Sequence, residues 1–71
     1  MAFNDADLRM ADDHVAQGER HITRQHQIIE ELRSRGHSTT MAEQLLIEFE
    51  ATLAQHRAHR DTMVRSNSML D

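Results

Sequence analysis

The sequence predicts an all-α protein, an antiparallel two-helix hairpin that dimerises into a four-helix bundle. Two segments carry apolar residues at alternating spacings of three and four, as in a helix with one buried face. A single turn signal, the Gly-His-Ser-Thr-Thr of residues 36–40, separates them. A chain of 71 residues buries little surface alone, so a second copy is expected to complete the core. The first stripe is Leu8, Ala11, Val15, Gly18, Ile22, Gln25, Ile29 and Leu32, and the second is Ala42, Leu46, Phe49, Leu53, His56, Arg60 and Met63.

The first helix is expected to span about residues 5–35. Asn4 can cap its N-terminus, with Asp7 three residues later near the positive end of the helix. Phe3 can pack on Leu8 as a hydrophobic staple. Gly36 is expected to adopt the left-handed conformation that closes many helices.

The second helix is expected to span about residues 40–65 and to lie antiparallel to the first, because the turn at residues 36–39 is short. Its opening residues, Thr40 to Glu43, fit the Ser/Thr-x-x-Glu capping box. The polar residues after position 65 predict a frayed tail over residues 66–71. The chain is therefore expected to form one domain, residues 1–71.

Antiparallel packing predicts which residues meet across the hairpin. Residues whose numbers sum to about 75 should face each other, which brings Ile22 to Leu53 and Gly18 to His56. Glycine within a helix costs roughly 1 kcal/mol relative to alanine, so Gly18 is expected to make room for a bulky neighbour, unless it is merely tolerated. Facing segments of the two helices also carry opposite net charges. Ion pairs between them are expected to favour the antiparallel orientation of the helices more than they add stability.

A second face remains once the two stripes are assigned. Flanking residues of both helices fall on the same side of the hairpin, in rows whose numbers sum to 73. This face is apolar at both ends and rich in histidine in the middle. A second copy of the chain is expected to cover it, and a helix of another protein is the alternative. We call the following ten residues the partner face: Met10, His14, His21, Ile28, Leu32, Met41, Leu45, Thr52, His59 and Met63.

Six histidines in 71 residues suggest a role for imidazole. His56 and His59 are three residues apart on one helix, and His14 should lie across from His59. These three are the weak candidates for ligands of zinc or another transition metal, although no metal or cofactor is assigned. The favoured interpretation is that the histidines are hydrogen-bonded polar residues at a dimer seam, and association that responds to pH is a further alternative.

Composition argues against several other classes of protein. The chain has no cysteine nucleophile and no glycine-rich phosphate loop, and Ser34, Ser38, Ser66 and Ser68 lack a convergent acid–base pair, so no enzyme is expected. A run of eighteen apolar residues is absent, so no membrane association is expected. The first five residues lack the features of a secretion signal, which favours a cytoplasmic location. The net charge of −4 and the small cluster of Arg20 and Arg24 make nucleic acid an unfavoured partner, and a small RNA- or DNA-binding hairpin remains an alternative.

A series of short runs is spread over residues 12–64. They are residues 18–22 (Gly-Glu-Arg-His-Ile), Arg24-Gln25, Ile28-Ile29, Leu32, Gly36-His37, Ala42-Glu43, Leu45-Leu46, Phe49-Glu50, Thr52-Leu53 and residues 56–60 (His-Arg-Ala-His-Arg). With these runs the chain resembles a group of short uncharacterised bacterial helical-hairpin proteins. The resemblance implies a small natural hairpin protein and supplies no activity and no functional residues. The favoured interpretation is thus a non-enzymatic protein–protein interaction module, a small homodimeric regulator or adaptor.

Overall fold

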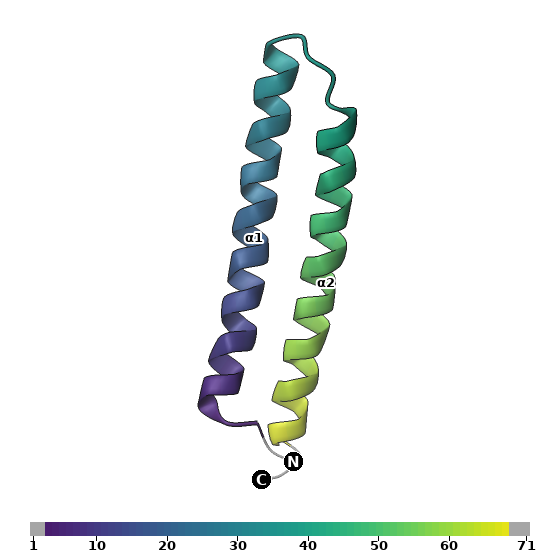
Figure 1. Cartoon of the computed structure of the whole chain (residues 1–71). Helices are drawn as coiled ribbons and strands as arrows, with labels where there is room; N and C mark the ends of the chain where they lie inside the picture. Colours follow the sequence, from purple (N-terminus) through teal and green to yellow (C-terminus); the bar gives the residue numbers. More distant parts are fainter. Residues whose placement is uncertain (1–2, 69–71) are drawn as a thin grey trace.

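The computed structural model describes residues 3–68, and these residues form a helical hairpin. Helix α1 spans Asp5–Ser34 and helix α2 spans Thr40–Ser68, and the two run side by side in opposite directions (Figure 1). The molecule measures 56 × 16 × 11 Å. The predicted all-α hairpin is confirmed. Neither helix, over the described residues, has the length and apolar character needed to span a membrane.

Helix α1 begins as the sequence predicts. The Asn4 side chain accepts a hydrogen bond from the backbone N–H of Asp7 at 2.8 Å, and the Asp7 carboxylate accepts one from the Asn4 N–H at 3.3 Å. This reciprocal pair is a capping box, with aspartate in the position usually held by glutamate. It satisfies two backbone donors that the first turn leaves without partners and holds a negative charge at the positive helix end.

Helix α1 ends in a Schellman motif. Gly36 has a φ of +73°, the left-handed conformation that was expected of it. The His37 N–H donates to the Leu32 carbonyl at 2.9 Å, and the Gly36 N–H donates to the Arg33 carbonyl at 3.1 Å. These two bonds satisfy carbonyl groups that the last helical turn would leave unpaired.

Replacing Gly36 by alanine is expected to lower the free energy of unfolding by about 1–2 kcal/mol, the cost of a Cβ in the left-handed region. No atom lies within 4 Å of a Cβ built at Gly36, so the cost is purely conformational. Urea unfolding followed by circular dichroism measures it. Gly36→Asn is the control and should lose less, because asparagine tolerates this conformation. An alanine variant as stable as the parent would contradict the argument.

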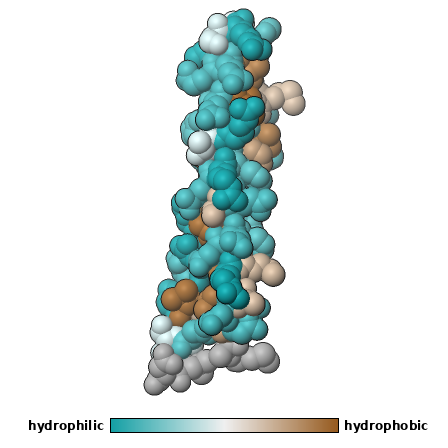
Figure 2. Space-filling model, turned by 90° about the vertical axis from the view of Figure 1, so that its left-hand side faces the viewer, coloured by the Kyte–Doolittle hydropathy of each residue, from teal (hydrophilic) through white to brown (hydrophobic). Residues whose placement is uncertain are grey.

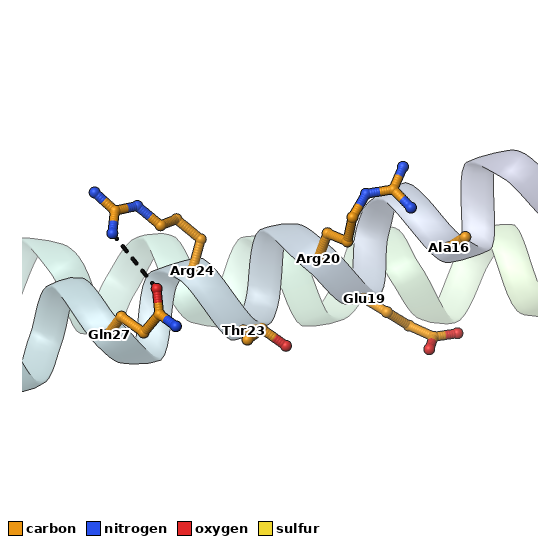
Figure 3. A pocket seen from close by; sticks show the side chains of 6 residues that line it. All are labelled: Ala16, Glu19, Arg20, Thr23, Arg24 and Gln27. Atoms are coloured by element: carbon orange, nitrogen blue, oxygen red, sulfur yellow. Dashed lines mark hydrogen bonds between the residues drawn. The ribbon is translucent and has the colours of Figure 1, made fainter.

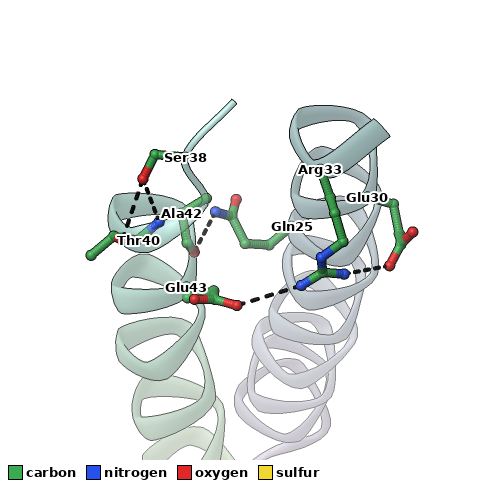
Figure 4. Close-up of polar contacts among 7 residues, drawn as sticks. All are labelled: Gln25, Glu30, Arg33, Ser38, Thr40, Ala42 and Glu43. Carbon is green, nitrogen blue, oxygen red and sulfur yellow. Dashed lines mark hydrogen bonds and ion pairs between the residues drawn. The ribbon is translucent and has the colours of Figure 1, made fainter. Parts of the chain in front are cut away.

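Helix α2 begins at the predicted residue, but its cap lies one residue earlier than expected. The Thr39 carbonyl accepts the first helical bond, from the Glu43 N–H at 2.8 Å. Thr40 is therefore already inside the helix. The Glu43 carboxylate approaches Arg33 of α1, with Oε1 3.6 Å from Nη2 (Figure 4).

The predicted frayed tail is wrong for residues 66–68, which are helical. The side chain of Asn67 makes two hydrogen bonds to the backbone of Phe3. Its Oδ1 accepts from the Phe3 N–H, and its Nδ2 donates to the Phe3 carbonyl, both at 2.9 Å. This paired contact joins residues 64 positions apart and extends the last turn of α2. Residues 69–71, the rest of the predicted tail, lie outside the described residues.

The two predicted stripes form the core. All fifteen of their residues are buried or half-buried, and the most buried apolar side chains are Ala11, Val15, Ile29, Leu53 and Met63. Gln25 is the single buried polar residue among the described ones, and its Nε2 donates to the Ala42 carbonyl of α2 at 2.9 Å (Figure 4). That bond gives a buried amide a partner and ties α1 to the first turn of α2.

Gly18 makes room for Leu53 rather than for His56. A Cβ built at Gly18 would lie 3.0 Å from Leu53 Cδ1, and its three nearest atoms all belong to Leu53. The interpretation that the glycine admits a bulky neighbour is supported. The predicted neighbour was wrong, and the leucine fills the space because it lies one helical turn earlier on the same face of α2.

Ion pairs join the helices where opposite charges were expected to meet. Three cross from one helix to the other: Arg33 with Glu43, Arg57 with Glu19 and Arg60 with Asp12, at 3.6–3.8 Å. Their side chains are largely exposed, so each contributes less than about 1 kcal/mol. Their main effect is to favour this pairing of the helices over alternatives.

Candidate interaction surface

The partner face carries large apolar side chains in contact with solvent. Met10 is 59% exposed, Met41 82% and Leu45 40%. Ile28 and Leu32 are half-buried. The polar residues in the middle of the face are all exposed: His14, His21, Thr52 and His59. Met63 differs from the rest: only 3% of it is exposed, so it belongs to the core.

Two shallow hollows between the helices lie on this face and adjoin each other at His14. The first brings together Met10 with Met63 and His14 with His59, and the second brings together His21 with Thr52. The flanks of α1 and α2 therefore lie on the same side of the hairpin, and three of the five predicted rows each share a hollow. The first hollow is lined by Phe3, Asp7, Met10, Ala11, His14, His59 and Met63, and the second by His14, Gln17, Gly18, His21, Phe49, Thr52 and His56.

Aromatic contacts across the hairpin organise the middle of the partner face. The rings of His14 and His56 have centroids 5.1 Å apart and planes tilted by 49°. His21 and Phe49 make a similar contact at 5.6 Å and 43°. His59, the predicted neighbour of His14, lines the same hollow, but the ring contact of His14 is with His56.

The three candidate ligands do not form a complete metal centre within one hairpin. In residues 3–68, no group of three or more histidine, aspartate or glutamate side chains is close enough to hold a metal ion. The structure brings His14 to His56 in ring contact and His14 to His59 along a hollow. A single chain thus offers at most a two-histidine site.

The cationic cluster lies elsewhere, on the outer side of α1. Arg20 and Arg24 project from this side together with Glu19 and Gln27, and Arg24 Nη1 donates to Gln27 Oε1 at 3.4 Å (Figure 3). Figure 2 shows that hydrophilic residues cover most of the surface on the α1 side of the hairpin. Glu19 lines the same hollow, and its carboxylate lowers the net positive charge there, which weakens a phosphate site.

Three residues that line the hollows belong to neither a predicted stripe nor the predicted partner face: Phe3, Asp7 and Gln17. A signal for two of them was present. Asp7 and Gln17 continue the alternating spacing of Met10, His14 and His21 along α1. Spacing alone places both residues on this side of α1, whatever their hydropathy.

Comparisons of the chain with protein-family models, curated proteins and solved structures found no match. The resemblance to short bacterial hairpin proteins stays a prediction. Function is therefore argued from the surface of the hairpin itself.

Proposed function

We propose that this protein is a non-enzymatic interaction module that works as a homodimer through its partner face. In this proposal two hairpins pack these faces together about a two-fold axis and form a four-helix bundle. The dimer is a small cytoplasmic regulator or adaptor, and its outer surfaces are free for other proteins. The observation that carries the proposal is the amount of surface that one hairpin leaves exposed.

The hairpin exposes more surface than a compact monomer of its mass. A folded monomer of 8.2 kDa exposes about 4,500 Å², whereas this chain exposes 5507 Å², an excess of about 1,000 Å². Its radius of gyration is 16.4 Å, against about 11 Å for a compact domain of this length. Stable interfaces bury about 800 Å² on each partner, so the excess is close to what one interface would remove.

The composition of the partner face favours a second copy. None of its ten residues is Asp, Glu, Lys or Arg, and of the other residues that line its two hollows only Asp7 carries such a charge; the core of an interface is depleted in charged residues. The face is apolar at both ends, with Met10 at one end and Leu45 and Met41 at the other. A two-fold axis brings apolar ends together whether the two hairpins run parallel or antiparallel, so the pattern is complementary to itself.

Replacing Leu45 by glutamate is expected to convert the dimer to a monomer, because the change puts a charge against the apolar end of the second copy. Ile47→Glu is the matched control. Ile47 is also an exposed aliphatic residue of α2, at 66%, but it lies outside the partner face, so the dimer should persist. Sedimentation equilibrium or light scattering measures both masses, and circular dichroism checks that both variants remain helical.

Three outcomes would overturn the proposal. The first is a parent protein that is monomeric at about 100 μM, far above the micromolar dissociation constants of ordinary complexes. The second is dissociation by Ile47→Glu with Leu45→Glu still dimeric, which would move the interface to the back of α2. The third is a parent monomer that forms a stable complex with a different helical protein, which would assign the face to a hetero-complex.

A further inference from the structure

His14 of α1 and His56 of α2 are in ring contact across the hairpin, and the proposed dimer gives this contact no role of its own. Their ring centroids are 5.1 Å apart. Both rings line the second hollow, where His14 is exposed and His56 is half-buried. None of the side-chain hydrogen bonds found in residues 3–68 involves either imidazole. Their nitrogen atoms are therefore available to a ligand that enters from solvent.

The separation of the two rings matches that of two imidazoles on one metal ion. A histidine nitrogen lies about 2.0–2.1 Å from a bound zinc ion. With tetrahedral angles, this bond length places the centroids of two coordinating rings about 5.2 Å apart. The 5.1 Å between His14 and His56 is close to this value, so rotation about the side-chain torsions, without movement of the helices, can aim both nitrogens at one ion.

We propose that His14 and His56 form a two-histidine site for a divalent transition-metal ion, which cross-links α1 to α2. Neutral imidazole is a preferred ligand of zinc, nickel and copper, and both ligands belong to helices of the same hairpin. The remaining coordination positions face the hollow, where water fills them in the free hairpin. The site lies beside Gly18, where the Gly18–Leu53 contact already brings the helices close together.

A metal titration of thermal unfolding tests this site. Zinc or nickel chloride should raise the midpoint temperature of the parent protein, because the ion binds only the folded arrangement of the pair, and EDTA should reverse the shift. His14→Ala and His56→Ala should each abolish the shift, and the double variant should lose no more than either single one. His14→Gln keeps a polar side chain of similar length and should also abolish it. His26→Ala and His37→Ala are controls at exposed histidines outside the pair, and they should keep the shift.

Calorimetric titration should give one ion per chain for the parent protein. Both ligands come from one hairpin, so the Leu45→Glu variant, in which the proposed dimer no longer covers the hollow, should bind the ion at least as well as the parent does. A shift that survives in the His14→Ala/His56→Ala variant, or two single variants that each lose half of it, would overturn the proposal. Absence of a shift in the parent would do so too. Binding that is lost with Leu45→Glu would show that the ion is held between copies and not within one hairpin.

Discussion

Replacing Leu53 by alanine is expected to lower the free energy of unfolding by about 2–5 kcal/mol, the range measured for buried leucines in other proteins. Leu53 is 5% exposed and packs against Gly18, which has no side chain to move into the vacated space. The cavity should therefore persist. For a chain of 71 residues the total stability is on the order of 4–11 kcal/mol, so the variant should lose a large part of the stability of the hairpin. Urea unfolding monitored by circular dichroism, at one fixed protein concentration, measures the loss.

Ile47→Ala provides the control for Leu53→Ala. It shortens an aliphatic side chain on the same helix, but Ile47 is 66% exposed. A surface change of this kind should alter stability by less than about 0.5 kcal/mol. If the two variants lost equal stability, the core would not lie along the stripe that contains Leu53.

The helices and their core could be predicted because they follow from local chemistry and periodicity. Spacings of three and four identify the buried face directly, so every residue of both stripes is buried or half-buried. Gly36 could be predicted for a related reason, since a helix that ends before a sharp turn requires a left-handed residue there. The burial of Gln25 could be predicted from its spacing alone, whereas its hydrogen bond to the Ala42 carbonyl could not.

The errors concern contacts between distant parts of the chain. The end of α2 was placed too early because its polar residues were judged by composition, whereas Asn67 is held by the backbone of Phe3. The predicted neighbour of Gly18 was wrong because one sum, about 75, was applied along both stripes, whereas the numbers of Gly18 and Leu53 sum to 71. The numbers of His14 and His56 sum to 70 on the partner face, while those of Arg57 and Glu19 sum to 76 on the other side. Residues advance around a helix as well as along it, so facing pairs differ between the two sides.

That the remaining flanks of α1 and α2 lie on one side of the hairpin could be predicted, and the hollows bring together Met10 with Met63 and His21 with Thr52. That this side binds a partner stays a prediction. Met63 was given to both the core and the partner face, and its burial assigns it to the core. The contact of His14 with His56 rather than with His59 depends on side-chain direction, which spacing alone does not determine.

Replacing Gly18 by valine is expected to destabilise the hairpin by about 1–3 kcal/mol, as other overpacked cores are. A Cβ at this position already lies 3.0 Å from Leu53 Cδ1, and the branched side chain adds two more carbon atoms beside it. The higher helix propensity of valine offsets only a few tenths of a kcal/mol of this loss. Gly18→Ala should change stability much less, because its gain of about 1 kcal/mol in propensity opposes a single tight contact.

The combined variant Gly18→Val/Leu53→Ala shows whether these two residues share one space. Each single change is harmful for the opposite reason: one leaves a cavity and the other overfills the site. In the combined variant the valine occupies the volume that the leucine vacates. The loss of stability should therefore be smaller than the sum of the two single losses by more than about 1 kcal/mol, within the range measured for residues in contact. Strictly additive losses in urea unfolding would mean that the valine is accommodated elsewhere, and that Gly18 does not set the approach of α1 to α2.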